Sequence, residues 1–266
     1  MNLHLTGWDI ALLIAVSGMG TVLAYLYHPQ WKAVMLTLPI PFSMAFLSLE
    51  TPINVTNVAG LLVLLAFTHA VRILYYNYNV RIVITIAVAA IGYCLVGTLL
   101  ASILPTEKHI GELAFWIVFG LVVLTGIAFY ILQPIREDRG HRTTMPVWLK
   151  LPVMFGVVLI LIVLKNSLQG FMTVFPMVGV IAAYEGRFSL WTNCHKVALI
   201  MFSMGPMMAA MYIVQHWFGW SAIPSLALGW GVLLSILLPM TREIWTLPVG
   251  ETPASAPEGA ETVKIG

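Results

Sequence analysis

Ionisable side chains inside apolar segments are the residues of this sequence that could do chemistry. Glu50 and Glu185 stand near the ends of long apolar runs, and His69 lies deeper within another. A charged group inside hydrocarbon is costly, so such residues are candidates for binding a solute or carrying a proton. The alternatives are a solvated helix end for each glutamate and a hydrogen bond to a neighbouring helix for His69.

Two prolines precede these glutamates at one spacing. Both segments read Pro-x8-Glu, from Pro41 to Glu50 and from Pro176 to Glu185. Nine helical residues rise about 13–14 Å, which predicts each proline near the bilayer midplane and each glutamate near an interface. Proline within a membrane helix frees backbone carbonyls, so we expect both prolines to line a central cavity. Kinks that only shape packing are the alternative.

The match continues after each glutamate. Thr56-Asn57 and Thr192-Asn193 begin the next apolar segments, and a tyrosine follows each pair 20 residues later. These side chains could contact a substrate, or they could cap the exposed amide groups of a helix start.

One lysine stands shortly before each proline, Lys32 in the first copy and Lys165 in the second. If the two copies cross the membrane in opposite directions, Glu50 meets Lys165 outside and Glu185 meets Lys32 inside. These pairs are predicted to act as latches, one closed while the other is open. Four independent solvated side chains are the alternative, because exposed ion pairs contribute only about 0–1 kcal/mol. The predicted substrate-binding or gating residues are therefore Lys32, Pro41, Glu50, Thr56, Asn57, His69, Lys165, Pro176, Glu185, Thr192 and Asn193.

Composition fixes the kind of element that positions these residues. Of 266 residues, 60% are hydrophobic and 9% charged, with a mean hydropathy of +0.93, against about 45–50% and about 25% in soluble proteins. We expect an all-α, polytopic membrane protein. A net charge of +2 offers no basic field for nucleic acid. Two cysteines in apolar runs form no ligand cluster, and no metal or cofactor is predicted.

Breaks at proline, glycine, asparagine and charged residues predict about nine spans. They are 8–27, 32–50, 55–77, 80–104, 110–133, 148–165, 168–185, 190–217 and 221–240. With the N-terminus outside, eleven of the thirteen Lys and Arg residues fall on the inner side, and only Lys108 and Lys165 fall outside. The positive-inside rule then predicts a cytoplasmic C-terminus in the cytoplasmic (inner) membrane.

The repeat unit is four spans long. Residues 1–105 form the first unit, 106–146 a linker span with a cytoplasmic loop, 147–240 the second unit, and 241–266 a disordered cytoplasmic tail. Because corresponding spans are five apart, the units are predicted to have opposite orientations, an inverted 4+1+4 repeat typical of secondary transporters.

The second unit resembles a known family. Its stretches VLKNS, TVFPMVGVIAAYE and FSMGPMMAAMYIV, between Trp148 and about Pro239, are similar to the small four-span GlpM-type membrane proteins. The resemblance covers about a third of the chain. It implies that a four-span protein was duplicated and fused through a fifth span, and it carries no activity over.

These patterns favour a secondary transporter or exporter that moves a small solute by alternating access and is not an enzyme. No ATPase motif is present, so an ion gradient would drive coupled transport. Its partners would be membrane lipids and a small-molecule or ion substrate. The alternatives are a membrane-embedded enzyme acting on lipid-linked substrates, and a non-transporting assembly or sensor subunit.

Overall fold

The structure is a computed structural model that describes residues 6–25, 38–105, 108–133, 147–185, 187 and 190–246. Within these ranges every regular element is a helix. The first part of the chain forms α1 (Gly7–Tyr25), α3 (Ile40–Leu49), α4 (Val55–Tyr76) and α5 (Ile82–Ile103), and α6 (Lys108–Leu132) follows. The second part forms α7 (Val147–Leu168), α8 (Phe171–Val174), α9 (Met177–Glu185), α10 (Leu190–His216) and α11 (Ala222–Thr246).

The long helices have the length and composition of membrane spans. In the described part of the chain, 6 helices (α4, α5, α6, α7, α10 and α11) are long and apolar enough to cross a bilayer. α1, α3 and the α8–α9 segment are apolar but shorter. The prediction of an all-α, multi-pass membrane protein is therefore confirmed, and the count of nine spans stays a prediction.

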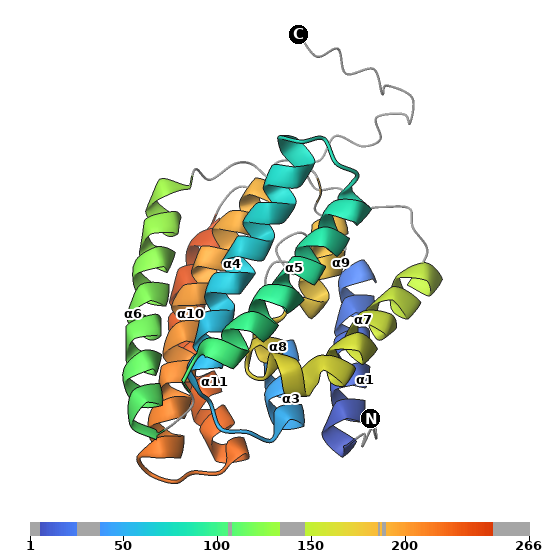
Figure 1. Cartoon of the computed structure of the whole chain (residues 1–266). Helices are drawn as coiled ribbons and strands as arrows, with labels where there is room; N and C mark the ends of the chain where they lie inside the picture. Colours follow the sequence, from blue (N-terminus) through green and yellow to red (C-terminus); the bar gives the residue numbers. More distant parts are fainter. Residues whose placement is uncertain are drawn as a thin grey trace, which may run out of the picture.

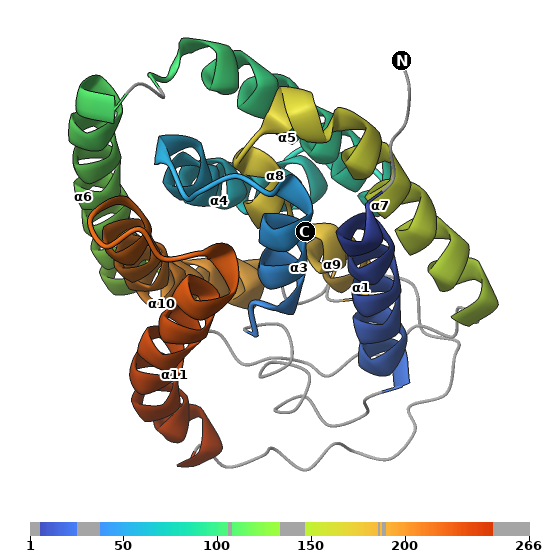
Figure 2. The ribbon, with the colours of Figure 1, turned by 90° about the horizontal axis from the view of Figure 1, so that it is seen from below.

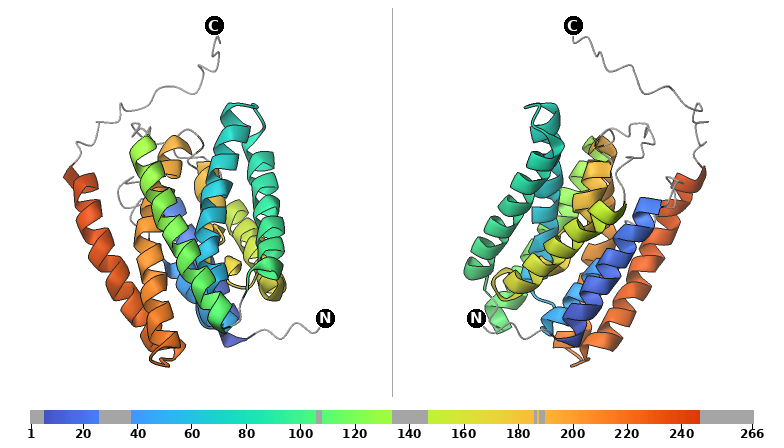
Figure 3. Two further views of the ribbon diagram at one scale, coloured as in Figure 1. Left: turned by 60° about the vertical axis from the view of Figure 1, so that its left-hand side comes forward. Right: turned by 90° about the vertical axis from the view of Figure 1, so that its right-hand side faces the viewer.

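The short helices occupy the middle of the bundle. Seen from below, α3, α8 and α9 lie between α1 and α7 on one side and α4 and α10 on the other (Figure 2). α5 covers α4 and α9, α6 covers α4 and α10, and α11 packs along α10 at the edge of the bundle (Figures 2 and 3). In Figure 1, α1, α4, α6 and α11 run from the lower to the upper end, and α5, α7 and α10 run in the opposite direction.

Burial separates the core helix from those that face lipid. In the most apolar window of α10, 72% of residues are buried, against 17% in α6. Ile117, Leu121 and Leu124 of α6 are exposed. Because a contiguous exposed apolar surface along a whole helix is rare on soluble proteins, this surface of α6 fits a helix that faces lipid.

The structure differs from the predicted segments in two places. The predicted span 168–185 is interrupted, since α8 ends at Val174 and α9 begins at Met177. α11 continues to Thr246, so the first residues assigned to a disordered tail are helical. Of the predicted span 32–50, only the part from Leu38 onward lies within the described residues.

Candidate functional site

The helix α3 starts at a pair of prolines. Pro39 is its N-cap residue, and Pro41 lies in the first turn. Proline is tolerated there because the first amide groups of a helix have no partner within the helix. The backbone N–H and the hydroxyl of Ser43 both donate to the Pro39 carbonyl, at 2.9 and 2.8 Å. Pro41 therefore begins a helix, where the sequence predicted a proline inside a span.

A second proline separates α8 from α9. Phe175 is extended (ψ 133°), as expected of a residue that precedes proline. Pro176 has no N–H to donate, and helical hydrogen bonding resumes where the Val180 N–H donates to the Pro176 carbonyl at 2.9 Å. The Phe175-Pro176 sequence thus divides the segment that was predicted as one span.

The proline-containing start of α3 and the proline between α8 and α9 line one cavity. Its volume is about 160 Å³, and most of its wall is apolar. The lining residues come from α1, α3, α4, the α8–α9 segment and α10, and they include Met19, Pro39, Pro41, Phe42, Leu64, Phe67, Thr68, Val71, Thr173, Val174, Phe175, Pro176, Val178, Ala182, Leu190, Asn193, Lys196, Val197, Ile200 and Met204. Polar groups come from Thr68, Thr173 and Asn193, and Lys196 supplies a charge. Among the described lining residues, no other side chain is charged.

Thr56 and Asn57 form hydrogen bonds to the α8 segment, which is part of the cavity wall. Asn54 and Asn57 form a capping box at the start of α4, in which the Asn54 N–H donates to Asn57 Oδ1 at 2.9 Å. Asn57 Nδ2 donates to Thr173 Oγ1 at 3.1 Å, and Thr56 Oγ1 accepts from the Gly170 N–H at 3.0 Å. The capping interpretation of the sequence is right for Asn57, and both residues also fix the cavity-lining α8 segment.

His69 contacts α6, and the cavity lining does not include it. Its Nδ1 lies 2.9 Å from the Leu65 carbonyl, and its Nε2 lies 2.6 Å from Gln133 Nε2. A carbonyl can only accept, so Nδ1 donates, and Nε2 of the neutral ring accepts from the Gln133 amide. The neighbouring Thr68 lines the cavity instead.

Both glutamates lie at the C-terminal ends of their helices. Glu50 is the C-cap residue of α3, is exposed, and has a left-handed backbone (φ 55°). It does not line the cavity. Glu185 ends α9 and Thr192 lies in the first turn of α10, and their side chains lie outside the described part of the structure, as does Lys32.

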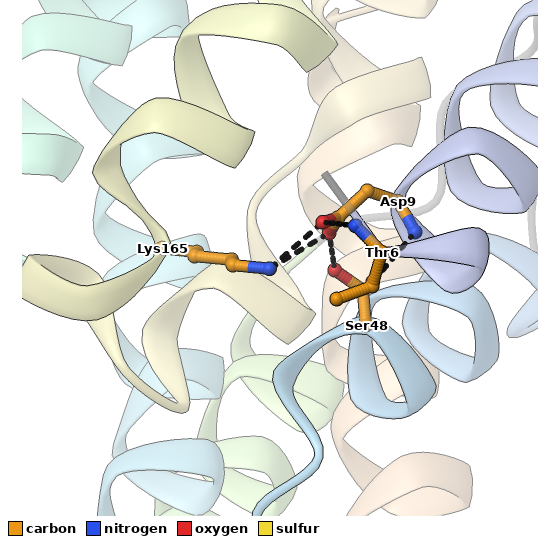
Figure 4. Close-up of polar contacts among 4 residues, drawn as sticks. All are labelled: Thr6, Asp9, Ser48 and Lys165. Atoms are coloured by element: carbon orange, nitrogen blue, oxygen red, sulfur yellow. Dashed lines mark hydrogen bonds and ion pairs between the residues drawn. The ribbon is translucent and has the colours of Figure 1, made fainter. Parts of the chain in front are cut away.

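Lys165 is paired with a residue that sequence reasoning missed. Its Nζ lies 2.9 and 3.0 Å from the two carboxylate oxygens of Asp9, where a pairing with Glu50 was expected. Asp9 also accepts from the Ser48 hydroxyl and from the Thr6 N–H, the latter at 2.8 Å (Figure 4). We call Thr6, Asp9, Ser48 and Lys165 the Asp9 cluster. Asp9 is completely buried, and the Lys165 side chain is 17% exposed.

A signal for Asp9 is present in the sequence. It is the one carboxylate of the first predicted span, 8–27, and follows Trp8, which opens that span. The pattern Thr6-x-x-Asp9 matches a capping box with aspartate in the third position, and the Asp9 N–H donates to Thr6 Oγ1 at 3.3 Å.

The geometry thus consists of a mostly apolar cavity between two short helices and a buried ion pair at the end of one of them. Comparisons with protein-family models, with curated proteins and with solved structures give no match to the chain.

Proposed function

We propose that this chain is a secondary transporter or exporter of a small solute, which works by alternating access in the cytoplasmic membrane. One observation carries the proposal. The proline-marked starts of two short helices, α3 and α9, line a single cavity within a bundle of apolar helices. Discontinuous helices that meet at a central cavity are typical of secondary transporters, because interrupted backbone is tolerated at membrane depth only where protein or a cavity surrounds it.

An inverted repeat would account for this arrangement of helices. α1, α3, α4 and α5 would correspond to α7, α8–α9, α10 and α11. Corresponding helices run in opposite directions (Figure 1), and α1 packs against α7 as α4 packs against α10. A two-fold axis in the membrane plane produces such antiparallel pairs. The resemblance of the second unit to four-span GlpM-type proteins fits a duplication through α6 as the linker.

Charge supports an orientation with nine crossings. Arg72 lies near the upper end of α4, over the ring of Trp191 at 4.0 Å, and Lys196 lies in the upper half of α10 (Figure 1). The positive-inside rule makes this the cytoplasmic end. The N-terminus would then be outside and the C-terminus in the cytoplasm, with the Asp9 cluster near the outer face.

The wall of the cavity supports a solute with a substantial apolar part. Its polar contacts would come from Thr68, Thr173, Asn193 and Lys196, which lie among apolar side chains. An enzyme acting on lipid-linked substrates would need clustered acidic or histidine groups. In the described residues, no group of three His, Cys, Asp or Glu residues is close enough to hold a metal ion.

A transport screen tests the proposal. The purified protein is reconstituted into liposomes, and the uptake and efflux of organic anions, organic cations and neutral amphipathic solutes are measured with and without a proton or sodium gradient. We expect flux of one class above protein-free liposomes, and saturation of that flux. Absence of flux for every class and every gradient, from protein that remains folded, contradicts the proposal.

A further inference from the structure

The Asp9 cluster joins three helices beyond one end of the cavity. Asp9 lies in the first turn of α1, Ser48 near the end of α3, and Lys165 in the last turn of α7 (Figure 4). α3 connects the cluster to the cavity directly, because Pro41 lines the cavity at the start of this helix. Seven residues of helix separate Pro41 from Ser48, about 10 Å along the axis.

We propose that the Asp9 cluster is the gate that closes this cavity toward the lower face of Figure 1. The inference rests on the proposed function. α1 belongs to the first unit and α7 to the second, so the ion pair between Asp9 and Lys165 holds the two units together at this end. In this proposal the path from the lower face opens by separation of α1 from α7, which pack against each other, and that movement breaks the pair.

The burial of Asp9 gives the gate two states, a closed ion pair and an open, hydrated path. Breaking a buried ion pair without solvent leaves an uncompensated charge, which is strongly unfavourable. Water that enters between α1 and α7 hydrates both groups and removes this penalty. A partly opened dry state is therefore less stable than either the closed pair or a water-filled path.

Asp9 is the fixed half of the gate and Lys165 the moving half. The Asp9 carboxylate keeps an acceptor bond from the Thr6 N–H of its own helix start, 2.8 Å long. Ser48 ties the same carboxylate to α3. Lys165 reaches it by a flexible side chain from α7 and can release it without unfolding either helix.

Thiol labelling measures the gate without a known substrate. In a Cys94→Ala, Cys194→Ser background, Val178→Cys places a reporter in the cavity wall. Phe218→Cys, in the exposed α10–α11 turn, identifies the lower face in a separate sample. A membrane-impermeant maleimide is added to sealed vesicles of each orientation, and the labelling rate of Val178→Cys is compared between the two faces.

We expect Asp9→Asn and Lys165→Met each to raise labelling from the lower face by about tenfold, through a shift in the population of the open state. Lys165→Arg, which keeps the charge and the reach, should retain the original rate. Glu112→Gln is the matched control, since Glu112 accepts from Trp217 Nε1 at 3.4 Å at the same end of the bundle but outside the cluster. It should leave the rate unchanged.

Two further variants guard against misfolding. Ser48→Ala leaves the ion pair intact and should raise the rate by a smaller factor. The double variant Asp9→Asn, Lys165→Met leaves no unpaired charge and should label as fast as the faster single variant. Unchanged labelling in these two variants, with Phe218→Cys reactive as before, overturns the gate.

The flux screen separates failure of the gate from failure of the transporter. Solute flux together with unchanged labelling overturns the gate alone. Increased labelling in the variants without flux of any solute overturns the transporter and leaves a gated cavity.

Discussion

Gly170 has no room for a side chain, because the start of α4 lies against it. A Cβ atom added there would lie 2.3 Å from Thr56 Oγ1 and 2.5 Å from the Asn57 backbone nitrogen. Backbone cannot move aside cheaply, so we expect Gly170→Ala to destabilise the protein by about 1–3 kcal/mol or more. Thermal unfolding in detergent measures this loss. Gly156→Ala is the control, since nothing lies within 4 Å of its added Cβ, and an equal loss in both variants would contradict the contact.

The hydrogen bond between His69 and Gln133 is predicted to stabilise the packing of α4 on α6. Gln133 is buried, and its Oε1 has no hydrogen-bond partner. Gln133→Leu removes the donor to His69 together with this unpaired oxygen, so the expected loss is small, about 1 kcal/mol. His69→Leu with Gln133→Leu should lose less than the sum of the single variants. Additive losses in thermal unfolding would show that the two side chains do not interact.

At the scale of elements, the break between α8 and α9 is predicted to serve transport rather than stability. Pro176→Ala restores a backbone donor and favours a continuous helix through the cavity wall. We expect this variant to stay folded and to lose most of its solute flux, and Pro41→Ala to change flux in the same direction. Pro152→Ala is the matched control, because Pro152 lies inside α7, is exposed and does not line the cavity. Normal flux in both cavity variants would show that the two prolines only shape helix packing.

For the whole molecule, the charge distribution predicts the orientation. Reporter fusions after Pro146 and after Ile265 should both report a cytoplasmic location, because the proposed topology has an even number of crossings between them: α7, α8–α9 counted as one, α10 and α11. A fusion before α1 should report the outer side. Opposite locations for the first two sites would remove the nine crossings, and with them the inverted repeat.

Features that depend on interactions within one segment could be determined from the sequence, whereas features that depend on contacts between segments needed the tertiary structure. Composition and the length of the apolar runs determined the helical membrane class, because runs of about 20 apolar residues are long enough to cross hydrocarbon as helices, which pair their backbone groups within one segment. The sequence identified Pro41 and Pro176 as sites where helical hydrogen bonding is lost, since proline lacks the N–H wherever it stands, but it did not predict that α3 starts at Pro39–Pro41 or that 168–185 is divided at Pro176.

Only the tertiary structure decided which distant residues meet. The left-handed cap of α3 leaves Glu50 exposed, while the close packing of α1 on α7 brings Lys165 to Asp9, 156 residues away in the chain. Thr56 likewise finds Gly170 because glycine allows α4 to approach within hydrogen-bonding distance. The charge of a residue indicates what type of partner it needs. Which residue becomes that partner depends on the packing of helices that are far apart in the sequence.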